Sequence, residues 1–88
     1  ALVLPTTPNV PPAISELARD EDYMRLNAVS LRNTSIGNFL DQCSISLPMH
    51  APGEPPTGFM LMAPHGRDQH MFALALATES ALASITQA

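Results

Sequence analysis

Two runs of the sequence predict the centre of the fold: Cys43-Ser-Ile-Ser-Leu-Pro-Met49 and Gly58-Phe-Met-Leu-Met-Ala63. In the first run, apolar residues alternate with serine and proline, which is the two-residue repeat of a strand. The second run is almost wholly apolar, and residues 50–57 between them carry turn-forming proline and glycine. We therefore expect an antiparallel hairpin. Its expected contributors to the core are Ile45, Leu47, Phe59 and Leu61.

A helix is expected after the hairpin. Pro64-His-Gly66 ends the second strand, and Asp68 is a residue type that suits the N-cap of a helix. Beyond it, one stripe recurs at helical spacing and predicts a helix with a single sheet-facing side. The members of this stripe are Met71, Leu74, Ala75, Thr78, Leu82 and Ile85.

The chain opens on a short apolar run, Leu2-Val-Leu4, which Pro5 and Pro8 bring to an end. Such a run is typical of a central strand that is covered on both faces. Because its neighbours would have to come from elsewhere, we expect residues 1–88 to be a single segment of a larger domain, incomplete as a catalytic unit.

The region from about Ile14 to Gln42 has helical spacing, and acidic residues at 20–22 suit the start of a helix. Asn33-Thr34-Ser35 and Gly37 predict a break, since short polar side chains compete for the local backbone. A short second helix is expected from about Ile36 to Asp41. The predicted fold class is thus α/β, in the order strand, helix, short helix, β-hairpin and helix, with the helices packed on a mixed sheet.

Composition narrows the classes of function. The formal net charge of −4 gives no basic surface for nucleic acid, and no apolar run reaches the length of a membrane span. We expect neither a nucleic-acid nor a membrane partner. Cys43 is the single cysteine and cannot form an internal disulfide, which favours a reducing compartment and hence a cytoplasmic location.

Several motifs, taken in order, resemble the C-terminal end of the amidase signature family of carbon–nitrogen hydrolases. They cover nearly the whole chain and end in an alanine-rich final helix. The matching pieces are Leu2-Val-Leu-Pro-Thr-Thr-Pro8, Arg32-Asn-Thr-Ser-Ile-Gly-Asn38, Ile45-Ser-Leu-Pro48, Pro56-Thr-Gly-Phe-Met-Leu-Met62 and Gly66-Arg-Asp68.

The resemblance implies hydrolysis of a carboxamide C–N bond to an acid and ammonia, with no cofactor. Members of the family use a serine nucleophile, a second serine joined through a cis peptide bond, and a lysine base in the middle of a longer chain. This sequence has no lysine and its four glycines are scattered, so no residue here inherits a catalytic role. The segment alone is expected to be inactive.

Four residues are the candidates for contact with a small-molecule amide substrate: Arg32, Asn33, Thr34 and Asn38. They cluster at the expected helix break, in a segment that is otherwise expected to pack against a sheet. A functional contact would explain why polar side chains occur there. The alternative is local: the asparagines and the threonine cap or bond nearby backbone while Arg32 is solvated.

The histidines do not predict a metal site. His65 and His70 are not at the spacing of three or four residues that shares a helix face, and His50 follows a strand elsewhere. Cys43 lies on the apolar side of its strand. His50 is an odd number of residues further along, so its side chain is expected on the opposite side, and the two are not expected to form a thiol–imidazole pair. The methionines at 49, 60 and 62 are expected to fill the core.

Two further classes of function stay open beside a stand-alone amidase. One is the glutamine-hydrolysing subunit of a tRNA-dependent amidotransferase, although Ala28-Val-Ser-Leu-Arg32 lacks the acidic residue expected in such a subunit. The other is a non-catalytic α/β interaction module. If the chain is a fragment, the exposed edge of strand 2–4 should lead it to self-associate.

Overall fold

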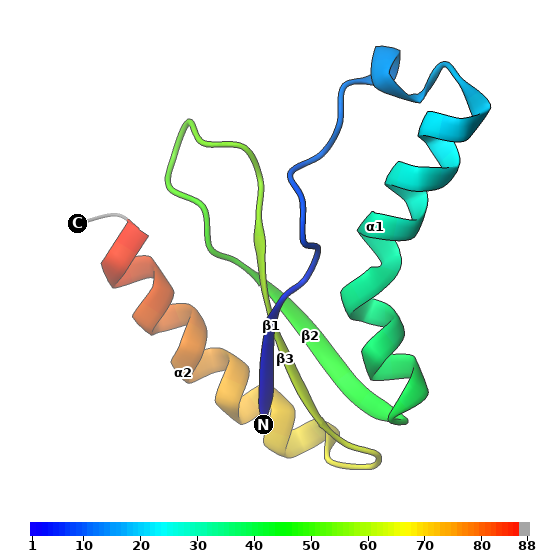
Figure 1. Cartoon of the computed structure of the whole chain (residues 1–88). Coiled ribbons are helices and arrows are strands. Elements are labelled where there is room, and N and C mark those ends of the chain that lie inside the picture. Colours follow the sequence, from blue (N-terminus) through cyan, green and yellow to red (C-terminus); the bar gives the residue numbers. More distant parts are fainter. Residues whose placement is uncertain (87–88) are drawn as a thin grey trace.

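The computed structural model describes residues 1–86 and forms a small α/β domain of two α-helices and a three-stranded antiparallel sheet (Figure 1). The strands are β1 (Leu2–Pro5), β2 (Gln42–Pro48) and β3 (Gly58–Pro64). The helices are a 3-10 turn η1 (Ile14–Leu17), α1 (Asp20–Phe39) and α2 (Asp68–Thr86). The sheet order is β1-β3-β2. The expected α/β class is confirmed, whereas the expected mixed sheet is not found in these residues, because each strand pair described in them is antiparallel.

The predicted hairpin is confirmed. β2 pairs with β3 so that Ile45 lies opposite Leu61 and Leu47 opposite Phe59. Leu47 and Leu61 are buried, and the other two pack against the same cluster from half-buried positions. Met60 and Met62 on the opposite face of β3 are also buried, as expected of core residues.

Within residues 1–86, β1 lies at the edge of the sheet, and its central position in a larger domain, with neighbours from elsewhere, stays a prediction. Its one neighbour among the described residues is β3, and the Leu2 and Val3 side chains are 49% and 50% exposed. The central strand is β3, in which four consecutive residues from Met60 to Ala63 are buried. Pro5 is compatible with an edge position because it has no N–H to donate to a ladder.

α1 runs without interruption through the expected break at residues 33–37, and there is no separate second helix. The two hydroxyl side chains that suggested the break bond back into the helix: Thr34 Oγ1 donates to the Leu31 carbonyl at 3.2 Å and Ser35 Oγ at 2.7 Å. Such back-bonding satisfies the hydroxyls inside the helix, so they do not end it. The helical region also begins later than expected, because Ile14–Leu17 forms η1 rather than the start of α1.

Gly37 marks the point where α1 comes closest to the sheet. A Cβ placed on it would lie 3.1 Å from Met62 Sδ and 3.3 Å from Ser44 Oγ. These partners lie on the face of the sheet opposite to Leu61, which packs against α2. The two helices therefore cover opposite faces of the sheet, as Figure 1 shows.

α2 begins at Asp68, which is the first helical residue rather than a cap in front of the helix. Met71 and Ala75 are buried in the core, and Leu74 and Leu82 pack against it as predicted. The prediction for Ile85 is wrong, because its side chain is exposed near the end of the helix. No helix in residues 1–86 is long and apolar enough to cross a membrane.

Candidate functional site

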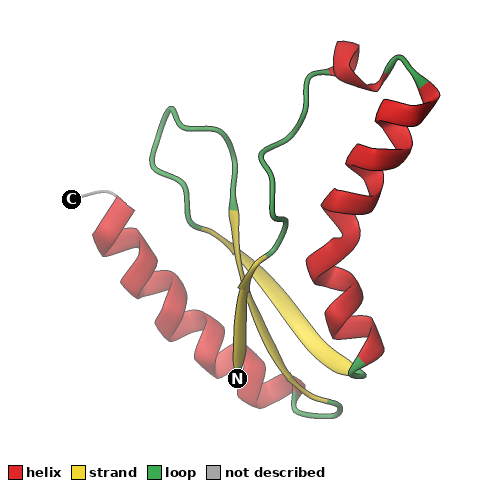
Figure 2. Ribbon diagram, viewed as in Figure 1, coloured by secondary structure: helices red, strands yellow, loops and turns green. Residues whose placement is uncertain are grey.

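A groove of about 320 Å³ lies where the three strands reach one end of the sheet. Because β3 is antiparallel to both neighbours, its start lies beside the ends of β1 and β2. The loop after β1 and the loop between β2 and β3 leave the sheet at this same end (Figure 2). The side chains of Thr6, Ser46 and His50 are among those that line the groove.

A pair of hydroxyls forms the polar part of the groove. Thr6 Oγ1 and Ser46 Oγ are 2.5 Å apart and share a hydrogen bond. The Thr6 N–H also donates to the Gly58 carbonyl at 2.8 Å, which extends the pairing of β1 with β3. A Cβ on Gly58 would lie 2.5 Å from Thr6 Oγ1 and 2.6 Å from Ser46 Oγ. Glycine at position 58 is therefore needed to let the two hydroxyls meet over the start of β3.

His50 closes the hairpin loop beside these hydroxyls. Its Nδ1 lies 3.2 Å from the Thr57 N–H and 3.3 Å from the Thr57 carbonyl oxygen. Since a backbone N–H can only donate, Nδ1 accepts from it in the neutral ring, which leaves the ring proton on Nε2. The Met49 N–H donates to the Thr57 carbonyl at 3.1 Å and completes the closure.

The groove has no catalytic pair of its own among the described residues. Ser46 is hydrogen-bonded to Thr6, and the imidazole of His50 to Thr57, so within residues 1–86 no serine–histidine bond activates a nucleophile here. The lining contains no acidic side chain and no lysine or arginine. Its hydroxyls suit a neutral polar group, which either donates or accepts a hydrogen bond.

The four residues predicted to contact a substrate all lie on α1, and none lines this groove. Asn33 is buried, at 5% exposure, and its Nδ2 donates to the Pro5 carbonyl at 2.8 Å. Arg32 Nε donates to Asn33 Oδ1 at 3.3 Å, so these two lie together beside the end of β1. Thr34 bonds within its own helix, and Asn38 is exposed. Substrate contact by these four residues stays a prediction.

Four residues of the groove were not predicted from the sequence: Thr6, Ser46, His50 and Thr57. A signal was available in the two short motifs that flank the strands, Pro5-Thr-Thr-Pro8 and Pro55-Pro-Thr-Gly58. An antiparallel sheet brings the residue after one strand beside the residue before its neighbour. Applied to β1 and β3, that rule would have placed these two motifs at one end of the sheet.

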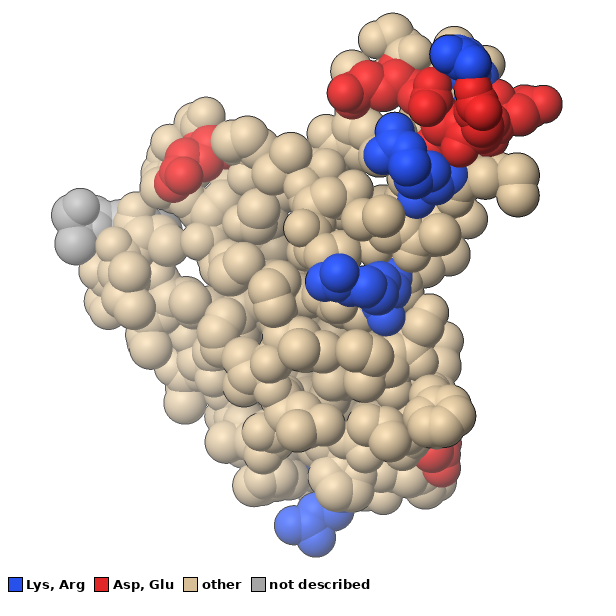
Figure 3. Space-filling model, in the orientation of Figure 1, with Lys and Arg blue, Asp and Glu red and all other residues tan. Residues whose placement is uncertain are grey.

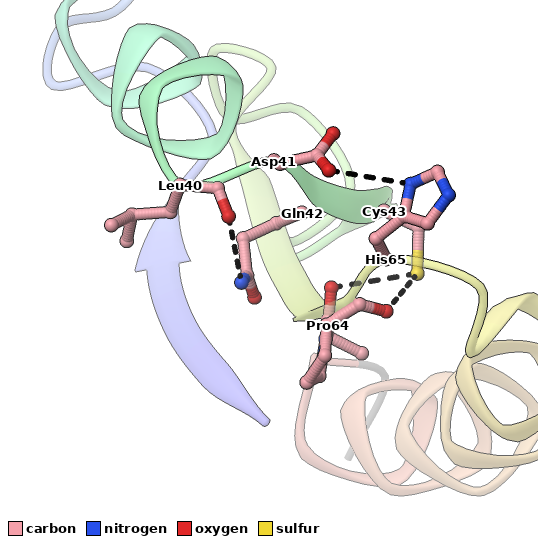
Figure 4. Close-up of polar contacts among 7 residues, drawn as sticks. Leu40, Asp41, Gln42, Cys43, Pro64 and His65 are labelled. Carbon is pink, nitrogen blue, oxygen red and sulfur yellow. Dashed lines mark hydrogen bonds and ion pairs between the residues drawn. The ribbon is translucent and has the colours of Figure 1, made fainter.

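The opposite end of the hairpin holds Cys43 and His65 without joining them (Figure 4). The Cys43 thiol points at the carbonyls of Ala63 and Pro64, both 3.5 Å away. His65 Nδ1 lies 3.5 Å from Asp41 Oδ2, and both of these side chains are largely exposed. No group of three or more His, Cys, Asp or Glu residues within positions 1–86 is placed to hold a metal ion.

Comparison with known proteins gives one informative match. The chain is 30% identical over 80 residues to a 2-amino-5-chloromuconic acid deaminase from Comamonas testosteroni. The aligned region covers 90% of this chain but 17% of the deaminase, so the chain spans about a sixth of the length of that relative. No family model and no solved structure matches the chain. The name of the relative denotes an enzyme that removes an amino group.

Proposed function

We propose that the chain is the C-terminal part of a larger amidase-type hydrolase, which cleaves a carboxamide C–N bond to an acid and ammonia. The observation that carries this proposal is the match to the deaminase, which extends along 90% of the chain. A deaminase and an amidase both break a carbon–nitrogen bond. The motifs that resemble the amidase signature family lie along the same stretch and point to the same chemistry.

The catalytic groups of the proposed enzyme lie outside these residues. Attack on an amide needs an activated nucleophile and donors for the developing oxyanion. The sequence contains no lysine, and the hydroxyl of Ser46 is bonded to Thr6 rather than to a base. We therefore assign the Ser–cis-Ser–Lys triad to the rest of the enzyme, and no catalytic residue, metal or cofactor to this segment.

The proposed contribution of this chain to the substrate pocket comes from α1. Among Arg32, Asn33, Thr34 and Asn38, the arginine is the best placed to bind, because Asn33 is buried and holds the Pro5 carbonyl. Asn33 Oδ1 accepts from Arg32 Nε and so orients the guanidinium, and no ion pair within residues 1–86 occupies it. A guanidinium binds a carboxylate or an amide oxygen through its paired N–H groups.

The test is release of ammonia by the gene product that includes the in-frame region encoded before Ala1. The substrates would be simple aliphatic and aromatic amides, glutamine and 2-amino-5-chloromuconic acid, the compound in the name of the relative. We expect the longer product to release ammonia from at least one of them and the 88-residue chain to release none. Ammonia from the 88-residue chain, or none from the longer product with any substrate, would contradict the proposal.

Arg32 gives the matched test of the pocket assignment. Arg32→Gln in the longer product should raise the KM for the active substrate at least several-fold. Arg67→Gln is the control, since Arg67 lies in the turn before α2. Equal kinetics for the two variants would remove Arg32 from the proposed pocket while leaving the proposed reaction intact.

A further inference from the structure

The outer side of α1 carries a largely apolar stripe that nothing in residues 1–86 covers. Its members recur every three or four residues, so they share one side of the helix. Its three large side chains are strongly exposed: Met24 by 70%, Leu31 by 51% and Phe39 by 88%. We call this set the outer stripe of α1. Its members are Met24, Ala28, Leu31, Ser35 and Phe39.

The dimensions of the molecule also indicate that it lacks a packing partner. Its accessible surface is 6163 Å², against about 5000 Å² for a folded monomer of the same mass. Its radius of gyration is 14.8 Å, against about 12 Å for a compact domain of this length. The principal extents of 42 × 35 × 13 Å describe a flat body. A chain with this surface has faces that a self-contained domain would bury.

The charge of α1 is concentrated at its start, next to the Met24 end of the outer stripe. The acidic residues Asp20, Glu21 and Asp22 and their arginine neighbours gather at the start of α1, where Figure 3 shows most of the charge on the visible face. No member of the outer stripe is charged. The stripe therefore suits an apolar protein surface, of the kind found in permanent interfaces rather than in a site for an ionic ligand.

We infer that the outer stripe of α1 packs against the part of the same polypeptide that lies outside these 88 residues. This inference shares with the proposed function the premise of a longer chain. The premise is supported by the deaminase, of which the aligned region makes up 17%. A covalently linked partner is present at high effective concentration, so an apolar face can be left uncovered in one segment and buried by another. The stripe is then an internal interface of the enzyme.

Oxidation of native methionine tests the inference without any substitution. Met24 is strongly exposed, whereas Met62 is buried against the sheet and serves as the internal control. Dilute hydrogen peroxide converts an accessible methionine to its sulfoxide. We expect Met24 to oxidise at least tenfold faster than Met62 in the 88-residue chain, and at a rate close to that of Met62 in the longer gene product. Equally fast oxidation of Met24 in both proteins would overturn the inference.

Thiol labelling extends the test along the helix. In a Cys43→Ala background, Phe39→Cys and Leu31→Cys should react with a maleimide at least tenfold more slowly in the longer product than in the 88-residue chain. Glu54→Cys, at an exposed position of the loop between β2 and β3, is the control and should react alike in both. The introduced cysteines could already be protected from the maleimide in the 88-residue chain, and more strongly at higher protein concentration. That result would assign the stripe to a second copy of the chain and overturn the inference.

The outcomes separate this inference from the proposed reaction. A longer product with a protected stripe and no release of ammonia would contradict the proposed function and leave the interface standing. A longer product that releases ammonia while Met24 and Phe39→Cys stay reactive would overturn the interface and leave the proposed function standing. A gene product that ends at the same 88 residues would overturn both.

Discussion

The two faces of the sheet are covered in different ways. On the α2 side, residues from two strands and the helix form one buried apolar cluster: Leu47, Leu61, Ala63, Met71 and Ala75. On the α1 side, the helix approaches through a glycine, Gly37, and through the hydrogen bond from Asn33 to Pro5. The large apolar side chains of the outer stripe of α1 point away from the sheet.

The difference shows that α2 and α1 are held by different interactions. Burial of side chains holds α2, and its contribution grows with the apolar area removed from water. α1 is held to the sheet by close approach of Gly37 to the buried Met62 and by the hydrogen bond from Asn33 to Pro5, so small size and a matched donor matter there in addition to buried area. The effect of a substitution should therefore follow the side of the sheet on which it lies.

The largest effect is expected in the α2 cluster. Leu61→Ala should lower the free energy of unfolding by about 2–5 kcal/mol, because it leaves a cavity in the shared core of β3 and α2. Leu76→Ala is the matched control, since Leu76 lies on the exposed side of α2 and should cost no more than about 0.5 kcal/mol. Urea unfolding measures both, and similar losses for the two leucines would refute the assignment of the core to this face.

The next effect is expected at the closest approach of α1. Gly37→Leu should cost about 1–3 kcal/mol, because its side chain would enter the space held by Met62 and Ser44. Gly37→Ala is the control. Alanine adds about 1 kcal/mol of helix propensity but meets Met62 Sδ at 3.1 Å, so the two effects should nearly cancel. A Gly37→Leu variant as stable as the parent in urea would show that α1 does not pack closely at this point.

The α2 side was predictable from the sequence because burial on one face directly determines the spacing of its apolar residues. The alternation of Ile45 and Leu47, the apolar run around Leu61 and the stripe through Met71 all record burial on one face. Such a pattern can be recognised without knowledge of the tertiary contacts. The hairpin and the final helix were therefore correct in type, and nearly so in their bounds.

The α1 side was not predictable in the same way. Gly37 and Ser35 have low helix propensity, and the sequence alone cannot show that Met62 requires a small residue or that the Leu31 carbonyl accepts the serine hydroxyl. The short apolar run of β1 does not by itself distinguish a central strand from an edge strand, because both positions are compatible with the same few residues. The groove was missed because its hydroxyls come from segments far apart in the chain.

A smaller loss is expected when the polar tie between α1 and β1 is removed. Asn33→Ala should cost about 1–2 kcal/mol, since the buried amide donates to the Pro5 carbonyl at 2.8 Å. Asn33→Asp keeps the size but cannot donate when ionised, so it should cost at least as much. Asn38→Ala, at an exposed position of the same helix, is the control and should change little. Equal stability of all three variants in urea would mean that the Asn33 bond does not hold α1 to β1.

The smallest effect is expected at the junction of α1 and β2, where Asp41 has a left-handed backbone with φ of 53°. This conformation costs a residue with a side chain about 1 kcal/mol, and glycine avoids the cost but loses more entropy on folding. Asp41→Gly should therefore raise the free energy of unfolding by no more than about 1 kcal/mol, while Asp41→Ala should lower it by a similar amount. Asp41→Asn separates the backbone from the charge, because asparagine tolerates the same conformation but cannot form the exposed ion pair with His65. We expect the asparagine variant to match the parent in urea. A loss as large as that of the alanine variant would instead assign the role of Asp41 to its carboxylate.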